Sequence, residues 1–363
     1  KGSCVWFADR LLRMAGQSVG RYTSPHLSQF NERIAVNGKL STDAQLVSAL
    51  DAVAAANTDI ALTYFELTTL AALHVFAAAE VDARVLEIGL GGRLDAVNVV
   101  SPDVCLLTNV GLDHQRWLGD TVEEIGAEKA AVFRADVPAV VATRTPPDSV
   151  MSALESSGAS PWVVGRHYDY GGGETWWWQT DGRRIDELPA VSGQHQQQNI
   201  SAVLAALQAV DVLNTLNDER IREVVREHHV PGRLEWCAGT PEVLFDVAHN
   251  RESVGQLADW LVAHPGDGPT TMVIGAMQDK PVRAMLKQLA PYGDQWIAVA
   301  APEARAMQAR QMAQLMAQVT GQPALVAGSP AAGMRMARRL TPADGRIVVA
   351  GSFPVVGKAR ARL

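Results

Sequence analysis

The spacing of apolar positions divides the chain into alternating helices and strands. Apolar residues three and four positions apart predict amphipathic helices, and short runs rich in valine, isoleucine and leucine predict buried strands. The predicted helices cover residues 3–15, 42–56, 121–134, 197–210 and 218–229, and another begins at Thr63. The predicted strands cover residues 19–23, 84–88, 104–109, 138–142, 243–247, 271–274, 296–299, 324–327 and 347–350. This alternation is typical of a doubly wound parallel sheet, so the predicted fold class is α/β.

Two interruptions of the pattern indicate how the chain is organised. Residues 167–187 are rich in glycine and aromatic residues and predict a β-hairpin, whose Trp176-Trp177-Trp178 run we interpret as packing. The 363-residue chain is too long for one ordinary core, and Val230-Pro231-Gly232-Arg233 is the best candidate linker. We therefore expect one domain at residues 1–230 and another at 236–363, joined by a linker at 231–235.

Composition narrows the classes of function. The net charge of −7 argues against general nucleic-acid binding, which requires a basic face. The three cysteines lie far apart and fit neither a disulfide framework nor a zinc pattern, so we expect a reducing cytoplasm. The longest apolar stretch, residues 61–81, is interrupted by Glu66 and His74, which predicts a core helix rather than a membrane span. We expect neither nucleic acid nor membrane as a partner.

The first three residues, Lys1-Gly2-Ser3, precede a predicted helix. A lysine followed closely by serine or threonine ends a phosphate-binding loop. In such a loop backbone N–H groups hold phosphates, the lysine reaches the terminal phosphate and the hydroxyl binds Mg²⁺. An accidental Lys-Gly-Ser is the plain alternative. Because the chain begins without methionine and inside this motif, we expect that its true N-terminus is missing.

Residues 87–98 form the most informative stretch of the chain. A predicted strand ends at Glu87, and three glycines follow at positions 89, 91 and 92. Glycine lets backbone approach a ligand closely. An acid at the end of an apolar strand is where nucleotide-binding α/β proteins hold Mg²⁺. Ser24 and His114 also follow predicted strands, so they are further candidate ligands.

Lys129 lies in a fairly apolar turn of the predicted helix at 121–134. A solvated helix lysine is the plain interpretation. A functional lysine there would contact phosphate, or carry a carbamate that serves as a metal carboxylate. Because a carbamate forms on the neutral amine, burial would have to lower the pKa of Lys129.

In the second half of the chain, polar residues follow three predicted strands that we expect to be neighbours. They are Asp246, His249 and Asn250 after the first strand, Asp279 and Lys280 after the second, and Ser352 after the third. This gathering predicts a ligand site, which Arg233 of the linker can reach. Asn199, which we expect to open a helix, is otherwise a good cap. The incomplete dinucleotide fingerprint and the absence of a Gly-x-Ser-x-Gly sequence disfavour an NAD enzyme and a serine hydrolase.

Together these segments resemble the bacterial dihydrofolate synthase/folylpolyglutamate synthase family of the Mur ligase superfamily. The resemblance follows family order along nearly the whole chain. It rests on residues 1–3, 24–27, 32–33, 62–66, 86–98, 112–114, 128–130, 231–233, 245–250 and 351–353. It implies a P-loop-type Mur ligase central domain that binds ATP, followed by a smaller Rossmann-like C-terminal domain. We expect a monomer.

The reaction that the resemblance implies joins a carboxylate to the amine of L-glutamate. ATP phosphorylates the carboxylate to an acyl phosphate, which the amine then attacks. Phosphorylation is needed because a free carboxylate is anionic and has oxide as its leaving group. The implied substrates are dihydropteroate, folates and L-glutamate, and the implied cofactors are ATP and one or two Mg²⁺ ions. We expect both dihydrofolate formation and glutamate addition to folates.

The resemblance also implies roles for individual residues. Lys1, Gly2 and Ser3 would bind ATP, and Lys1 would also be catalytic. The metal ligands would be Ser3, Ser24, Glu87, His114 and a carbamylated, catalytic Lys129. The other ATP contacts would be Asn199, Arg233 and Asp246, with catalytic His249 close to the transferred phosphate. The pterin-side pocket would be lined by Thr23, Thr63, Tyr64, Leu94 and Asp95.

Two alternatives remain open at this stage. A peptidoglycan Mur ligase would use the same chemistry on a different substrate, although no extra UDP-binding domain is visible in the sequence. A nucleotide-binding protein without catalysis is the other, because the first four residues of the family's phosphate loop are absent. The family's Asp-Lys-Asp motif also reads Asp279-Lys280-Pro281 here, which weakens any role for its final acid.

Overall fold

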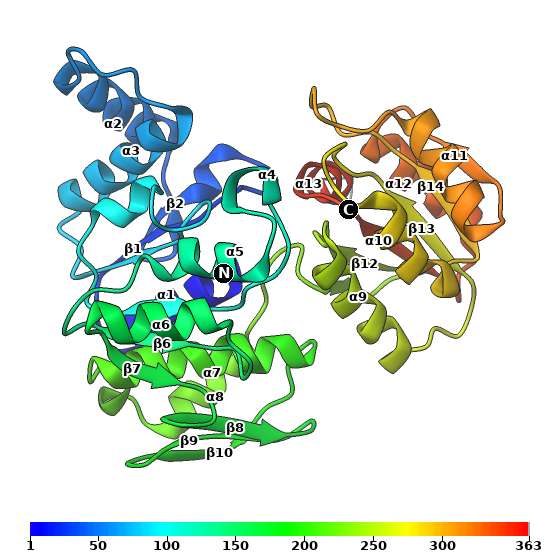
Figure 1. Ribbon diagram of the computed structural model, residues 1–363. Coiled ribbons are helices and arrows are strands. Elements are labelled where there is room, and N and C mark those ends of the chain that lie inside the picture. Colours follow the sequence, from blue (N-terminus) through cyan, green and yellow to red (C-terminus); the bar gives the residue numbers. More distant parts are fainter. Residues whose placement is uncertain (362–363) are drawn as a thin grey trace. The chain divides into compact units, whose positions relative to one another are not determined.

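The computed structural model describes residues 1–361, which fall into two compact units (Figure 1). The N-terminal unit comprises Lys1–His26 and Phe30–His228. The C-terminal unit comprises Leu27–Gln29 and the residues from His229 onward. The expected domain ranges and the linker at 231–235 stay predictions. Among the described residues, no helix combines the length and the apolar character needed to cross a bilayer.

The first sheet of the N-terminal unit pairs two parallel strands, β1 (Val19–Tyr22) and β4 (Ala83–Leu86). An antiparallel hairpin of β2 (Ile34–Val36) and β3 (Lys39–Leu40) extends it, in the order β3-β2-β1-β4. Helices α2 (Asp43–Ala56) and α3 (Tyr64–Ala78) cover it as a helical pair (Figure 1). Tyr22, Ile34 and Phe76 are fully buried in the core between sheet and helices.

A second sheet contains the parallel strands β5 (Cys105–Leu107), β6 (Pro138–Val141) and β7 (Ser160–Val163). Successive side chains of β6 point to opposite faces of this sheet and pack in two different cores. Val140 packs in the cluster of α1 (Gly2–Met14) and α7 (Gln194–Ala209), whereas Val141 packs in the cluster of α6 (Asp148–Ser157). The remaining helices here are α4 (Gln115–Leu118), α5 (Val122–Ala130) and α8 (Asp218–Arg226).

Two predicted capping boxes are present in the structure, but two helices differ from their predicted ranges. The predicted capping boxes of Thr63 with Glu66 and of Thr121 with Glu124 are both formed. The predicted helix at 121–134 ends at Ala130, so Lys129 lies in the last turn rather than in mid-helix. The prediction that Asn199 caps a helix is wrong. Helix α7 begins at Gln194, because buried glutamines extend it beyond the apolar positions from which the helix was predicted.

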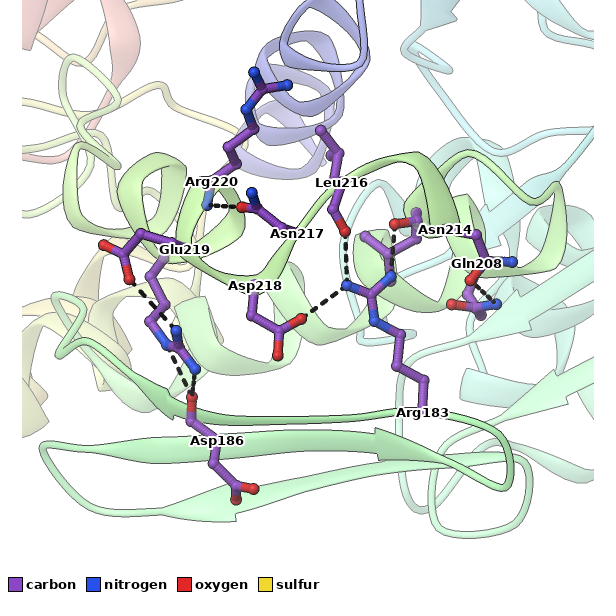
Figure 2. A network of polar contacts seen from close by, with 11 residues as sticks. Arg183, Asp186, Gln208, Asn214, Leu216, Asn217, Asp218, Glu219 and Arg220 are labelled. Carbon is purple, nitrogen blue, oxygen red and sulfur yellow. Dashed lines mark hydrogen bonds and ion pairs between the residues drawn. The ribbon is translucent and has the colours of Figure 1, made fainter.

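The predicted hairpin at 167–187 is a three-stranded antiparallel sheet of β8 (Tyr168–Gly172), β9 (Trp176–Thr180) and β10 (Arg184–Leu188). Trp176 and Trp178 are buried in the core of α1 and α7, so these two tryptophans serve packing. Arg183 ties the sheet to the helices beside it (Figure 2). Its guanidinium donates to the backbone oxygens of Leu213 and Leu216 and pairs with Asp218, the first residue of α8.

The C-terminal unit is a six-stranded sheet in the order β11-β12-β16-β13-β14-β15. The strands are β11 (Glu235–Cys237), β12 (Glu242–Asp246), β13 (Thr270–Ile274), β14 (Gln295–Ala298), β15 (Ala324–Val326) and β16 (Arg346–Ala350). All pairings are parallel except that of β11, an antiparallel edge strand that the sequence analysis did not predict.

Helices cover both faces of this sheet, as the doubly wound prediction requires. They are α9 (Arg251–Ala263), α10 (Val282–Leu289), α11 (Ala309–Thr320), α12 (Pro330–Leu340) and α13 (Phe353–Arg360). One core contains Leu257 of α9 and Met312 of α11, and the opposite core contains Met334 of α12 and Val355 of α13. The predicted α/β class is confirmed, and the methionines of α11 are core residues.

Candidate functional site

Three segments of the N-terminal unit meet at the carboxyl ends of β1 and β4. Lys1 is the N-cap of α1, and its Nζ donates to the backbone oxygens of Ile88 (2.5 Å) and Gly89 (3.1 Å). The backbone N–H of Ser24 donates to Oε2 of Glu87 at 3.2 Å. Because β1 and β4 are parallel neighbours, the residues that follow them emerge at the same sheet edge. The structure thus brings Lys1, Ser24 and Glu87 together.

The environment of Glu87 fits a cation. The residue is only 6% exposed, and within residues 1–361 its carboxylate has no ion-pair partner. A buried carboxylate without a cation is costly, and carboxylate and hydroxyl oxygens are the ligands that Mg²⁺ prefers. Gly2 lies beside it, since a Cβ there would stand 3.7 Å from Oε2 of Glu87. Ser3 is also buried, and its hydroxyl accepts a hydrogen bond from Nε2 of Gln196 (3.4 Å).

The glycine loop after Glu87 is held at both ends by contacts that leave no room for a side chain. A Cβ on Gly89 would stand 2.6 Å from the ring of Phe65, and one on Gly92 would stand 2.7 Å from the backbone oxygen of Glu128. The backbone N–H of Arg93 donates to that same oxygen at 3.1 Å, and its side chain pairs with the Glu128 carboxylate at 2.8 Å. The loop therefore connects the Glu87 edge to the last turn of α5.

His114 and Lys129 both belong to helices that touch this loop. His114, in the left-handed region with φ 54°, is the N-cap of α4. A Cβ on Gly91 would stand 2.8 Å from the side chain of Leu118 in that helix. The half-buried Lys129 has its backbone oxygen 2.9 Å from the Cβ position of Gly92. No group of three His, Cys, Asp or Glu residues suited to a metal exists in the described part of the chain. Of the five proposed metal ligands, only Glu87 and His114 are of these residue types, and the metal-binding role of the five residues stays a prediction.

The expected pterin-side residues divide into two groups. Thr63 caps α3, and Asp95 accepts hydrogen bonds from the N–H groups of Leu90 and Val97, so both have structural partners. The Thr23 hydroxyl likewise donates to the backbone oxygen of Glu32. In contrast, the side chains of Tyr64 and Leu94 are exposed, by 58% and 81%. These two are the residues that a planar apolar ligand can cover.

Arg33 belongs to a segment on which the resemblance rests, but the sequence analysis assigned it no role. It is 7% exposed, and its guanidinium lies 5.8 Å from the ring of Phe30 and 5.5 Å from that of Tyr64. Its Nε donates to Nδ1 of His26 at 2.9 Å, and within residues 1–361 no carboxylate pairs with it. A buried cation with aromatic faces but without an acid fits an anionic ligand group. Only tertiary structure shows this burial.

In the C-terminal unit, the polar residues expected at three strand ends do gather, because β12, β16 and β13 are adjacent. Asp246 ends β12 and accepts hydrogen bonds from the N–H groups of Leu234 and Ala248, both at 2.7 Å. Burial raises the pKa of Asp246 above its usual value, although Arg233 and the two N–H donors act in the opposite direction. Asp246 thus fixes the local backbone and lies within the electrostatic reach of Arg233.

Phe353, the first residue of α13, lies between two of the expected functional side chains. The guanidinium of Arg233 stands 4.9 Å from its ring, and the ring of His249 is 6.0 Å away. Nδ1 of His249 is 2.8 Å from the backbone oxygen of Val247, which can only accept a hydrogen bond. Nδ1 therefore carries the hydrogen, and the lone pair of the neutral ring is on Nε2.

Two further polar groups lie at this edge. The hydroxyl of Ser352, at the N-cap of α13, is buried and has no hydrogen-bond partner in the part of the chain that the structure describes. The Lys280 side chain is 9% exposed, with Nζ 4.0 Å from Oδ2 of Asp279. A helix N-terminus with an orphaned hydroxyl fits an anionic oxygen. By contrast, Asn199 lies inside α7, where it bonds Gln196, and its contact with ATP stays a prediction.

Comparisons with known proteins agree with this layout. Residues 232–353 match the Mur ligase, glutamate ligase domain. The chain is 36% identical over 299 residues to the dihydrofolate synthase/folylpolyglutamate synthase of Escherichia coli, covering 82% of this chain and 69% of that protein. It also matches the structure of Escherichia coli FolC in complex with DHPP and ADP at 32% identity. That match has a TM-score of 0.92 over 99% of this chain and 85% of the other.

A second solved structure extends the comparison. A bifunctional folylpolyglutamate synthase/dihydrofolate synthase with Mn, AMPPNP and L-glutamate bound matches at 32% identity with a TM-score of 0.91. The match covers 99% of this chain and 86% of that one. Both structural matches cover 99% of this chain and therefore both of its units, and the resemblance noted in the sequence is confirmed. The chain belongs to the dihydrofolate synthase/folylpolyglutamate synthase family of ATP-dependent glutamate ligases.

Proposed function

We propose that this enzyme joins L-glutamate to dihydropteroate to give dihydrofolate, and also adds glutamate to the tail of folates. The observation that carries the proposal is the meeting of Lys1, Ser24 and the buried, unpaired Glu87 carboxylate at the edge of parallel strands. The relatives' names and the ligands of their structures support it. The family assignment sets aside the peptidoglycan-ligase alternative.

The residues divide the chemistry between the two units. Lys1 neutralises charge on the terminal phosphate, and Ser3, Ser24, Glu87 and His114 are the proposed Mg²⁺ ligands, with a carbamylated Lys129 for a second ion. When bound, the ions screen the negative charges of ATP and of the attacked carboxylate. ATP transfers its terminal phosphoryl group to that carboxylate, and the glutamate amine displaces phosphate from the acyl phosphate. Nε2 of His249 is the proposed acceptor of the proton that the amine loses.

Substrate recognition is assigned to exposed apolar side chains and to polar side chains of both units. We assign the exposed Tyr64 and Leu94 to the pterin side and Arg33 to a substrate carboxylate. Ser352 and Arg233 in the C-terminal unit are assigned to anionic oxygens of glutamate or ATP. Asn199 and Asp246 are proposed ATP contacts, and Thr23, Thr63 and Asp95 support the pterin side. Most of these roles follow the resemblance to the family, and burial and charge support those of Arg33 and Ser352.

The direct test is phosphate release by the full-length enzyme with MgATP, L-glutamate and either dihydropteroate or tetrahydrofolate. We expect glutamate-dependent release with each, and mass spectrometry should find the glutamylated product. Release with only one acceptor would restrict the enzyme to that activity. Absence of release with both would favour the alternative of a nucleotide-binding protein without catalysis.

We further propose that the enzyme works as a monomer in a reducing cytoplasm. All three cysteines are free, two of them buried. Burial raises the pKa of Cys4 and Cys105, the latter to about 11, which keeps both as unreactive thiols. Light scattering of the purified enzyme tests the monomer, and a stable dimer would contradict it.

A further inference from the structure

Two buried glutamines in the first turn of α7 face different partners. Gln197 is 9% exposed, and its Nε2 donates to the backbone oxygen of Gly173 at 3.0 Å, in the turn between β8 and β9. Gln196 is 3% exposed, and its amide is directed at the start of α1. A buried amide is costly unless its hydrogen bonds are made inside the protein. The partners of Gln196 therefore show what this second amide is for.

A chain of three hydrogen bonds between α1 and α7 sets the direction of the Gln196 amide. The thiol of Cys4 donates to Oδ1 of Asn199 at 3.5 Å. Nδ2 of Asn199 points the other way and donates to Oε1 of Gln196 at 3.1 Å. Because an amide has its acceptor and its donors on opposite sides, Nε2 of Gln196 is left to donate to Oγ of Ser3, at 3.4 Å. All four residues belong to the N-terminal unit.

The Ser3 hydroxyl keeps bonding capacity in this arrangement. A hydroxyl has one hydrogen to donate and two lone pairs. Gln196 uses one lone pair, and within residues 1–361 the hydroxyl makes no other hydrogen bond. Its second lone pair and its hydrogen suit a metal ion and a phosphate oxygen. The preceding residue, Gly2, lies beside the proposed metal carboxylate, since its Cβ position is 3.7 Å from Oε2 of Glu87.

We propose that Gln196 is a positioning residue for magnesium–ATP, which acts by holding the Ser3 hydroxyl. Because Nε2 donates, the hydrogen of Ser3 cannot point at Gln196, and the hydroxyl presents its remaining lone pair and hydrogen to the ligand. Removal of a group that orients a metal ligand typically costs 10- to 100-fold in metal affinity or activity, on the order expected here. This inference rests on the proposed function, because it uses the assignment of Ser3 to the ion.

The test compares Gln196→Met with the matched control Gln197→Met. Each change removes one buried amide and its donated hydrogen bond from the same turn of α7, and methionine fills the space that is left. Electron paramagnetic resonance measures the Kd for Mn²⁺ of the full-length enzyme saturated with a non-hydrolysable ATP analogue. We expect that Kd to rise about 10-fold in Gln196→Met and to stay at the wild-type value in Gln197→Met.

The ligase assay supplies a second readout that a merely structural role would not move. Gln196→Met should need about 10-fold more free Mg²⁺ for its half-maximal rate, while kcat at saturating Mg²⁺ stays close to that of the wild type. Both variants should unfold at lower urea concentration than the wild type, because both lose a buried hydrogen bond. A shift in the Mg²⁺ requirement of Gln196→Met alone therefore separates positioning from stability.

A double-mutant cycle with Ser3→Ala tests whether Gln196 acts through Ser3. We expect Ser3→Ala to raise the Kd for Mn²⁺ at least as much as Gln196→Met does. Adding Gln196→Met to Ser3→Ala should change nothing further, because the hydroxyl that Gln196 holds is already gone. If Gln196→Met raises the Kd by the same factor with and without the Ser3 hydroxyl, the proposed route is wrong.

The remaining outcomes are equally decisive. Equal Mn²⁺ affinity in Gln196→Met and Gln197→Met would leave Gln196 with a packing role only. If Gln196→Met does not fold, Gln196→Leu, which also lacks a donor, is compared with the control in its place, and wild-type affinity there contradicts us. A wild type that binds Mn²⁺ with the analogue but shows no glutamate-dependent phosphate release refutes the proposed function, while the Mn²⁺ comparison still decides the role of Gln196.

Discussion

The acidic residues at two strand ends, Glu87 in the N-terminal unit and Asp246 in the C-terminal unit, occupy equivalent places in their sheets but have different surroundings. Glu87 accepts one backbone hydrogen bond and is neighboured by glycines, a lysine and a serine. Asp246 accepts two backbone hydrogen bonds and has Arg233 nearby. The first acid lacks a cation, and the second already has its partners. The same location therefore has an acid that suits a cation in one unit and an acid that is held by backbone hydrogen bonds in the other.

The groups around each acid reinforce this difference. Near Asp246 lie Arg233 and the orphaned hydroxyl of Ser352 at a helix N-terminus, which suit anions. Near Glu87 lie Gly2 and the backbone N–H of Ser24, and a carboxylate without an acidic or basic partner among the described residues suits a hard cation. Position at a sheet edge thus indicates where a ligand binds, and the unsatisfied groups indicate which charge it carries.

The largest effect should come from Glu87→Gln. This change keeps the shape of the side chain and removes the charge, so we expect kcat to fall about 1,000-fold while the fold is retained. Steady-state phosphate release and circular dichroism measure the two quantities. Glu124→Gln, at an exposed capping box, serves as the control and should leave kcat unchanged. Activity in Glu87→Gln close to that of the wild type would remove the metal assignment.

A smaller effect is expected at Arg33. Replacing it with glutamine removes a buried cation for which the described chain offers no acid. A charge-assisted hydrogen bond is worth about 1.5–3 kcal/mol, so the KM for dihydropteroate should rise about 10- to 100-fold. The exposed Arg84 of β4 provides the matched control, Arg84→Gln. A fall in stability without any change of KM would make Arg33 purely structural.

A substitution at Arg183, which has no proposed role in the reaction, should change stability without changing kcat. Arg183→Met removes hydrogen bonds to two backbone oxygens and the contact with Asp218 (Figure 2). We expect a loss of about 2 kcal/mol in the free energy of unfolding, with kcat unchanged at permissive temperature. The neighbouring Arg184, half exposed and paired with Asp186, gives the comparison variant Arg184→Met, which should cost much less. Equal losses in the two variants would contradict this.

The smallest effect concerns pH. Burial raises the pKa of Asp246 in the folded state, so the native protein holds this proton more tightly than the unfolded chain. Its contribution to stability is present at low pH and is lost as pH rises from the usual value of 3.8 through the raised pKa. Asp246→Asn should flatten that part of the stability profile in urea titrations. If the stability of Asp246→Asn depends on pH in the same way as that of the wild type, protonation of Asp246 does not contribute to the pH dependence of stability.

The sequence predicts the regular architecture well where local chemistry is strong. The capping boxes at Thr63 and Thr121, the strands β1, β4, β5 and β6 of the N-terminal unit, the strands β12 to β16 of the C-terminal unit and the adjacency of β12, β16 and β13 all follow from pattern. The hairpin of β2 and β3 was missed although it carries a recognisable signal. Asn37 and Gly38 form its two-residue turn, both with positive φ, as a twisted hairpin requires.

Other features depend on contacts between distant residues and have no local signal. Helix α7 begins three residues early because Gln196 and Gln197 are buried in spite of their polarity. The burial of Arg33 between two rings, the orphaned Ser352 and the close approach of the Leu27 backbone to Gly357 are likewise tertiary facts. Glycine at 357 is visible in the sequence, but the backbone that requires it is 330 positions away.

The central claim is that Glu87 and His114 share a divalent ion beside the outer phosphates of ATP. Anomalous scattering from crystals grown with Mn²⁺ and a non-hydrolysable ATP analogue tests it most directly. We predict a peak about 2.1 Å from a Glu87 carboxylate oxygen, with the His114 ring in the same coordination shell and a phosphate oxygen opposite. A peak that touches the phosphates but neither of these two side chains would contradict the account.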